Sequence, residues 1–186
     1  MEWRPFYKDT MRFFEGFFRQ TERLILKEAT TEDATILAKK RSTPFVMRYN
    51  LYEPCGEAQI AGELADNPHV LLKNRATGEI IGAISLRDDD FRYHIAAKEM
   101  AAWLTEEYAA QGLMSEAIPP VMDHIFNRDI ERISIRIFAE NKPSIRLAEK
   151  LGFVREGYLA RAVKNKQGEV FDVALYSLDA NNYLKK

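Results

Sequence analysis

The sequence predicts one mixed α/β domain built around a central sheet. Three observations lead to this prediction. The chain has 186 residues, which suits a single domain. Its 46% hydrophobic and 30% charged residues are an ordinary globular balance, which excludes wholesale disorder. Segments in which apolar and polar residues alternate are interspersed along the chain with segments of helical apolar spacing, as in a sheet covered by helices.

The first elements follow from short-range signals. Residues 21–28 are a strand-like run rich in Leu and Ile. Thr30, with Asp33 three residues later, is a helix-start signal and predicts a helix that runs to about residue 41. A second helix is predicted over 56–66, because an Asn-Pro pair follows it.

Three strands are predicted in the middle of the chain. Residues 69–74 and 80–86 are apolar runs that flank a turn-like Ala-Thr-Gly-Glu segment. Residues 97–105 show a weaker alternation and form the next strand.

The last third of the chain predicts a helix, a strand, a helix and a hairpin. Residues 112–128 have helical apolar spacing, although an interior Pro-Pro pair is unfavourable there. Residues 131–139 alternate isoleucine with polar residues, as a strand does, and the helix 143–151 is closed by glycine. The runs 154–164 and 169–178 form the hairpin. The prediction is therefore about seven strands and about four helices.

Residues 1–20 are unusually aromatic. They hold seven aromatic side chains: Trp3, Phe6, Tyr7, Phe13, Phe14, Phe17 and Phe18. Met11, Phe14, Phe17 and Phe18 recur at helical spacing, which predicts a short amphipathic helix. We interpret 1–20 as an arm packed over the core or over a partner subunit, rather than as a lid or substrate wall. The main domain is then 21–180.

Composition excludes several classes of protein. The 27 Lys and Arg residues balance the 28 Asp and Glu residues, so no global field favours nucleic acid or an anionic membrane. Cys55 is the single cysteine, which indicates a reducing, cytoplasmic setting. No apolar run approaches the roughly 20 residues of a membrane span. His69, His94 and His124 lie far apart, so no metal is expected.

The segment 103–117 is typical of an anion-binding turn. A strand ends, a short loop carries Gly112, and a helix begins. The first amides of a helix have no partner within it, and the positive end of the helix dipole lies there, so the position favours a phosphate group. The segment has neither the P-loop pattern nor a dinucleotide-binding fingerprint.

Several motifs in register resemble the GNAT superfamily of acetyl-CoA-dependent N-acetyltransferases, in particular the branch of ribosomal-protein alanine N-acetyltransferases. The resemblance covers residues 21–180. The matching segments are Thr-Glu-Arg-Leu-Ile-Leu-Lys at 21–27, Lys-Glu-Met-Ala-Ala-Trp-Leu at 98–104, Ala-Gln-Gly with Glu-Ala at 110–117, Asn141 with Ser144, Glu-Lys-Leu-Gly-Phe at 149–153, and Asp-Val-Ala-Leu-Tyr-Ser-Leu at 172–178.

The resemblance implies an acetyl-CoA site. The strand that ends in Trp103, Leu104 and Thr105 would splay from its neighbour and bind the pantetheine arm through its backbone. The residues whose amides would hold the pyrophosphate are Gln111, Gly112, Leu113, Met114 and Ser115. Asn141 would touch the CoA arm, and its alternative role is a helix cap.

Three positions depart from the family pattern. Ala110 replaces the usual first glycine of the loop, and Met114 stands where a small residue is usual. Ala148 occupies the position where many members carry a tyrosine that acts as general acid. A thiol with a pKa near 8.5 leaves readily, so this acid is dispensable, and Ser144 is a substitute donor.

Glu99 is the candidate general base, because it resembles a glutamate that many members carry on this strand. Its alternative role is an exposed strand glutamate paired with an arginine. His94 is the second candidate base, with a plain loop histidine as its alternative. Asp172, Tyr158 and Tyr176 are candidates for the acceptor pocket, although Tyr176 also suits the core. Glu116 reads as a charge favoured in the first turn of a helix.

The sequence thus predicts transfer of an acetyl group from acetyl-CoA to a primary amine within one ternary complex, in a monomer or a homodimer. Cys55 lacks a nearby histidine, so a covalent acyl intermediate on it has no support. Two acceptors stay open, a protein N-terminal α-amine such as that of a ribosomal protein, and a small-molecule amine. The rival from another class is a non-catalytic acyl-CoA-binding module.

Overall fold

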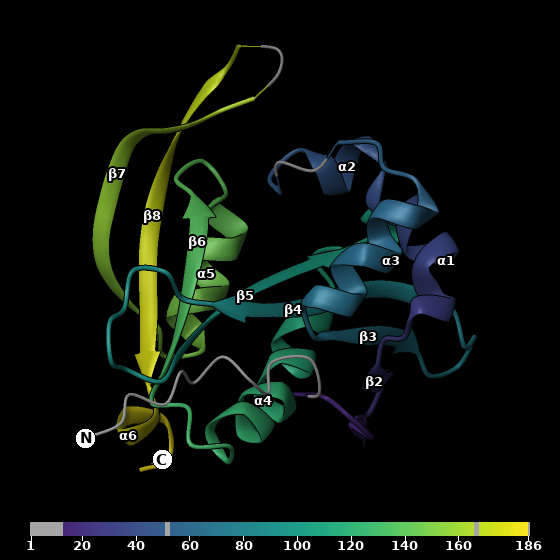
Figure 1. The fold of residues 1–186 in the computed structure, drawn as a ribbon, viewed down its shortest axis with the longest axis horizontal. Helices are drawn as coiled ribbons and strands as arrows, with labels where there is room; N and C mark the ends of the chain where they lie inside the picture. Colours follow the sequence, from purple (N-terminus) through teal and green to yellow (C-terminus); the bar gives the residue numbers. More distant parts are fainter. Residues whose placement is uncertain (1–12, 51–52, 166–167, 186) are drawn as a thin grey trace.

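A computed structural model describes residues 13–50, 53–165 and 168–185. Its centre is one eight-stranded sheet of order β1-β2-β3-β4-β5-β6-β8-β7, with helices on both faces (Figure 1). The strands are β1 (Phe18–Gln20), β2 (Leu24–Glu28), β3 (His69–Asn74), β4 (Ile80–Asp88), β5 (Ala97–Leu104), β6 (Arg132–Phe138), β7 (Val154–Lys164) and β8 (Val170–Asp179). All neighbours are antiparallel except β5 and β6.

The four predicted helices are present, and the mixed α/β fold class is confirmed. They are α1 (Ala34–Arg41), α3 (Glu57–Asp66), α4 (Leu113–Phe126) and α5 (Lys142–Lys150). Two single turns, α2 (Pro44–Met47) and α6 (Ala180–Tyr183), and two 3₁₀ turns, Thr31–Asp33 and Glu106–Tyr108, complete the described elements. No helix in the described ranges combines the length and apolar character that a membrane span requires.

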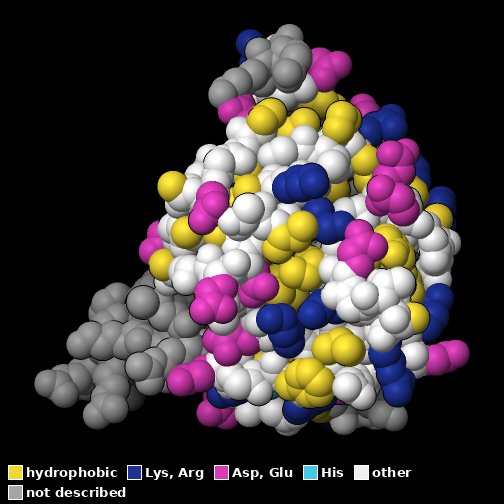
Figure 2. Space-filling view, turned by 90° about the vertical axis from the view of Figure 1, so that its right-hand side faces the viewer, with side chains coloured by type: hydrophobic (Ala, Val, Ile, Leu, Met, Phe, Trp, Pro, Cys, Tyr) yellow, Lys and Arg dark blue, Asp and Glu magenta, His cyan; other side chains and the backbone are white. Residues whose placement is uncertain are grey.

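Two hydrophobic clusters cover the two faces of the sheet. The larger cluster packs α4 and α5 against one face, with Val121 and Ile125 fully buried. The smaller cluster packs α1 and α3 against the other face, over Leu71 and Trp103. Alternate residues of a strand point to opposite faces, so Glu99 and Ala101 lie on the same face as Trp103. Charges of both signs are interspersed over the surface seen in Figure 2.

Strands β5 and β6 separate part-way along their length. Their parallel pairing covers only three positions and ends at Glu99 opposite Ser134. Beyond that pair, β5 stays with β4 as far as Leu104, and β6 stays with β8 as far as Phe138. The splay that the family resemblance implied is therefore present, and it leaves one edge of β5 without a strand partner.

The predicted amphipathic helix near the N-terminus is wrong where the structure describes it. Residues 13–16 form a turn, and β1 then pairs with β2. Phe13, Phe14 and Phe17 are buried in the larger cluster and surround the His124 ring. Rings this large stabilise by the area they bury, whichever secondary structure carries them. The remaining aromatic residues of the predicted arm, in 1–12, lie outside the described residues.

Candidate active site

The N-terminus of α4 presents free amides, as the sequence predicts. Gly112 is the N-cap residue and has φ +77°, in the left-handed region that glycine adopts without strain. The first helical hydrogen bond runs from the Glu116 N–H to the Gly112 carbonyl, over 3.2 Å. The amides of Leu113, Met114 and Ser115 precede it and have no helical acceptor. Together with the helix dipole they form a site suited to a pyrophosphate.

Glu116 fixes this loop to the start of the domain. Its carboxylate accepts from the Thr21 hydroxyl at 2.5 Å, and from the Arg23 amide and Nε at 2.8 Å each. Arg23 Nη1 then donates to the Gln111 carbonyl at 2.9 Å. Partial burial opposes ionisation, but the hydrogen bonds from Thr21 and Arg23 outweigh it and lower the pKa of Glu116. Glu116 is therefore more than the first-turn charge that the sequence indicated. It ties the loop to residues 21–23.

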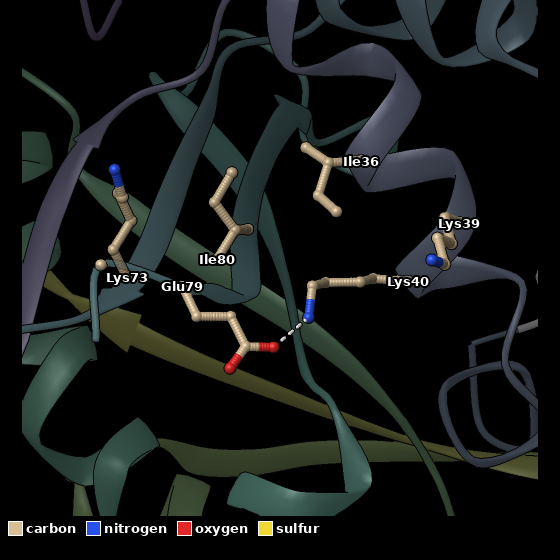
Figure 3. Close-up of a pocket in the computed structure, with 7 residues that line it drawn as sticks. Ile36, Lys39, Lys40, Lys73, Glu79 and Ile80 are labelled. Atoms are coloured by element: carbon tan, nitrogen blue, oxygen red, sulfur yellow. Dashed lines mark hydrogen bonds and ion pairs between the residues drawn. The ribbon is translucent and has the colours of Figure 1, made fainter.

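A second brace reaches the loop from the other side. Glu79 accepts from Lys40 Nζ at 2.6 Å and from the Tyr108 hydroxyl at 3.0 Å, and these two bonds lower its pKa. Tyr108 belongs to the 3₁₀ turn that precedes the loop. Figure 3 shows Lys40 and Glu79 meeting between α1 and the β3–β4 turn. Both residues line a cavity of about 470 Å³. The cavity lies beside the loop and apart from the splay.

Ala110 adopts φ +58°, a left-handed conformation that costs an L-residue about 1–2 kcal/mol. We expect Ala110→Gly to raise the free energy of unfolding by about 1 kcal/mol in urea titrations, because it removes this strain. The matched control is Ala109→Gly, at a residue with φ −70°, which should lower it by about 0.5–1 kcal/mol. If both variants lowered the free energy of unfolding equally, the backbone at Ala110 would not be strained.

The splay offers polar groups that suit a pantetheine arm. The Thr105 hydroxyl is buried and has no hydrogen-bond partner in the described part of the chain, although its amide donates to the Ile81 carbonyl at 2.8 Å. A buried orphan hydroxyl is rare and indicates a missing partner. Trp103 is buried against the α1 and α3 layer, and Leu104 is half-buried against the other face. Beyond Glu99, the backbone edge of β5 that faces β6 has no strand partner.

The start of α5 carries two further predicted residues. The Asn141 side chain accepts from the Ser144 amide at 3.3 Å, so Asn141 caps this helix. Ser144 is half-buried, and Ala148 is buried in the core. The buried Tyr176 hydroxyl donates to the Glu149 carboxylate at 3.0 Å, and burial followed by this bond raises its pKa. Tyr176 thus fills the core, the second of the two roles predicted for it.

Glu99 lies at the point of the splay and contacts two arginines. Its side chain is only 5% exposed. One carboxylate oxygen accepts from Arg87 Nη2 at 2.5 Å, and the other accepts from Arg136 Nε at 2.8 Å and from Arg136 Nη2. Because Arg87 is on β4 and Arg136 on β6, the carboxylate links three strands. The Arg136 bond crosses the opening, two residues beyond the last β5–β6 pair.

Comparison with known proteins identifies the family. The family model for the acetyltransferase (GNAT) domain matches residues 23–154, which is more than half of the chain. The chain belongs to the GNAT acetyltransferase family. A curated relative, the uncharacterized N-acetyltransferase p20 of Bacillus licheniformis, is 29% identical over 176 residues, covering 88% of this chain and 96% of that protein.

Solved structures share the fold of this GNAT domain. Ribosomal-protein-S5-alanine acetyltransferase from Vibrio fischeri superposes with a TM-score of 0.80 at 18% identity, over 90% of this chain and 99% of that one. RimL, a ribosomal L7/L12 alpha-N-protein acetyltransferase solved with coenzyme A, gives 0.74 at 20% identity, over 87% and 97% of the two chains. The family assignment makes the chain an acetyl-CoA-dependent N-acetyltransferase, rather than a non-catalytic binding module.

The other residues predicted for the site of this GNAT enzyme lie in the β4–β5 loop and in the terminal hairpin, and the contacts described below do not involve Glu99. His94 is an exposed loop residue with φ +60°. On the terminal hairpin, the Tyr158 hydroxyl donates to Asp172 at 2.5 Å, and the Arg161 amide donates to the same carboxylate at 2.6 Å. The Tyr158 bond lowers the pKa of Asp172 and raises the pKa of Tyr158. These bonds lie where the β7–β8 register shifts, between Leu159 and Val163, and they stabilise that part of the hairpin.

Cys55 lies under α3, and its sulfur accepts from Arg41 Nη2 at 3.3 Å and lies 3.7 Å from the Ser42 hydroxyl. In the described ranges, no group of three His, Cys, Asp or Glu side chains is arranged to hold a metal ion.

His69 lies on the same face of the sheet as Glu99, and the sequence did not single it out as a functional residue. Its Nδ1 lies 2.8 Å from the Asn67 carbonyl oxygen, which can only accept, so Nδ1 carries the proton. Burial lowers its pKa despite this bond and the nearby Glu63 carboxylate. The register places His69 opposite Ser85, and Ser85 opposite Ala101, in one row across the sheet. The period-2 alternation of the strand places His69 on this face.

His69 should make stability depend on pH. Its native pKa lies below the unfolded value of about 6.5, so the unfolded chain binds more protons. We expect the free energy of unfolding to fall as the pH drops from about 6.5 through the lowered native pKa. His124, lowered first by burial, adds to the same slope. In urea titrations between pH 7.5 and 5, His69→Asn should flatten the slope. An unchanged slope in His69→Asn would contradict this assignment.

Proposed function

We propose that this GNAT enzyme acetylates the α-amine of a protein N-terminus. The observation that carries the proposal is the double arginine contact of Glu99. Both carboxylate oxygens already accept hydrogen bonds from guanidinium groups, so Glu99 has little remaining capacity to draw a proton from an amine. A weak base suffices for an α-amine with a pKa near 7.8, because about a quarter of it is neutral near pH 7.4. It does not suffice for a lysine amine with a pKa near 10.4.

The proposed donor site uses the residues around the splay. The amides of Leu113, Met114 and Ser115, with Gln111 and Gly112 shaping the turn, would bind the pyrophosphate. The edge of β5, with Trp103, Leu104 and the Thr105 hydroxyl, would bind the pantetheine arm. Asn141 would reach the CoA arm from the start of α5 while it caps that helix.

The proposed reaction is direct transfer. The amine nitrogen forms an amide bond with the thioester carbonyl carbon, and the carbon–sulfur bond breaks. Glu99, through a water molecule, would accept the proton that the amine loses. The Ser144 hydroxyl would donate a hydrogen bond to the leaving thiolate, since Ala148 removes the tyrosine of other members. A thiolate with a pKa near 8.5 needs little further help to leave.

Two structural neighbours support this acceptor. Their names describe enzymes that act on ribosomal protein S5 alanine and on the α-nitrogen of ribosomal protein L7/L12. Each shares only about a fifth of its residues with this chain, so they support the fold directly and the acceptor only by analogy.

The test compares two amines in one peptide scaffold. One peptide has a free N-terminus and no lysine, and the other has a blocked N-terminus and one lysine. The proposal predicts acetylation of the first by mass spectrometry, with kcat/KM at least about a hundredfold above the second, which follows the ratio of neutral amine. Preference for the lysine peptide would overturn it.

A small-molecule amine is the second candidate acceptor. The Tyr49 ring meets Phe138 at 6.3 Å between centroids, and Phe138 stacks on Phe171 at 5.1 Å. These ring contacts join the segment after α2 to strands β6 and β8. They would narrow the path by which an acceptor reaches Glu99. Spermidine and glucosamine in the same assay distinguish the candidates, because their acetylation without peptide acetylation favours the small acceptor.

A further inference from the structure

Arg87 is an exposed cation beside the proposed reacting amine. The strand register places it directly opposite Glu99, on the face where β5 and β6 part. Its side chain is 56% exposed, against 34% for Arg136 and 5% for Glu99. Arg87 therefore extends from a buried carboxylate into the space where an acceptor would lie.

The two arginines share Glu99 unequally. One carboxylate is shared by two guanidinium groups, and Arg136 makes two of the three hydrogen bonds. The pKa of Arg136 is raised first by its bond to Glu99 and further by Asp89 and Asp90. Those two acids thus add to the neutralisation of Arg136. Arg87 makes the remaining hydrogen bond to Glu99 and is the more exposed of the two arginines.

Arg87 also has unused donors. A guanidinium carries five N–H groups in a planar fork that matches a carboxylate. Within the described residues, Arg87 uses only Nη2, toward Glu99. Two parallel N–H groups therefore remain for a second carboxylate, and such a pair combines charge with fixed geometry.

We propose that Arg87 binds a carboxylate of the acceptor, so that the preferred substrate carries an acidic group close to its reacting amine. This inference rests on the proposed function, because it concerns the same acceptor site. The acid is the side chain of Asp or Glu near a peptide N-terminus. A free amino acid offers the same chemistry through its own carboxylate.

The half-exposed position of Arg87 sets the size of the effect. A hydrogen-bonded pair of this kind, partly open to solvent, should favour the acidic acceptor about five- to tenfold at low ionic strength. The preference should shrink as salt is raised, because salt screens exposed charges.

The experiment measures kcat/KM for matched peptide amides. Ala-Glu-Ala-Ala is compared with Ala-Gln-Ala-Ala, and Ala-Ala-Glu-Ala with Ala-Ala-Gln-Ala, at 20 and 300 mM salt. Alanine against alaninamide tests the free amino acid. The readout is the acid-to-amide ratio within each variant, which cancels any effect of Arg87 on Glu99 itself. The variants are Arg87→Gln and Arg87→Lys. The charge-matched control is Arg19→Gln, on β1 at an edge of the sheet, three strands away from β4.

The expected result is a ratio near five to ten in the unmodified enzyme and in Arg19→Gln, a smaller salt-sensitive ratio in Arg87→Lys, and a ratio near one in Arg87→Gln. Transfer with equal rates for acid and amide peptides, or a ratio that survives Arg87→Gln, overturns this inference alone. Absence of transfer to every peptide, while acetyl-CoA still raises the melting temperature, overturns the proposed function and this inference with it. If the enzyme prefers alanine over alaninamide but shows no preference between the acid and amide peptides, the acceptor is a free amino acid and the peptide acceptor is wrong.

Discussion

Glu99→Gln is expected to lower kcat for an N-terminal peptide acceptor by about a hundredfold or more, the usual contribution of a general base. Glutamine keeps one acceptor oxygen, which can serve only one of Arg87 and Arg136, and it cannot take a proton. Stopped assays across pH 6–9 measure the effect. The KM for acetyl-CoA should stay within about twofold.

Two further variants separate chemistry from structure. Glu156 also accepts hydrogen bonds from two arginines, Arg92 and Arg132, but it lies on β7 away from the splay, so Glu156→Gln is the matched control. Glu99→Asp keeps the charge while it withdraws the carboxylate by one methylene, and it should fold and lose activity. If Glu99→Gln loses acetyl-CoA binding and activity together, or if its kcat stays normal, Glu99 is structural and its proposed role as a base is wrong.

Gly82→Ala should be the most damaging single-methyl substitution in the sheet. A Cβ at residue 82 would lie 2.2 Å from the Trp103 carbonyl oxygen and 2.8 Å from Leu104 Cδ2. Both contacts belong to β5, and the oxygen is backbone that a rotamer change cannot move. We expect a loss of about 3 kcal/mol or more in the free energy of unfolding, together with weaker acetyl-CoA binding.

The control is Gly62→Ala in α3, where an added Cβ meets nothing within 4 Å. It should stabilise the protein by about 0.5–1 kcal/mol, because alanine favours the helix. Urea titrations of both variants measure the pair of effects. A Gly82→Ala protein as stable as the unmodified one would show that β4 and β5 separate more easily than their packing indicates.

The elements were predictable where one local pattern dominates. The isoleucine alternation of β6 and the apolar spacing of α4 gave boundaries within two residues. β1 was missed because three residues carry too little pattern, and the phenylalanines around it recur at helical spacing. The prolines of α4 were unfavourable by rule, yet the helix continues through Pro119 and Pro120, whose flanking residues Ile118 and Val121 are buried.

The candidate site was predictable in part. The family motifs place the loop, the splay and Glu99 in the chain, because these depend on short segments. The partners of Glu99 come from 12 and 37 residues away and depend on strand register, which no local pattern encodes. The same is true of Arg23 and Glu116, which are 93 positions apart.

The Thr21–Glu116 contact also sets when the site can form. Its two residues are 95 positions apart, so the contact closes a long loop and belongs to the slow, non-local part of folding. During synthesis at roughly 5–20 residues per second, Thr21 leaves the ribosome about 5–20 s before Glu116 does. A nascent chain that ends before α4 therefore carries Arg23 without its carboxylate. The pyrophosphate loop reaches its final shape only after more than half of the protein has been made.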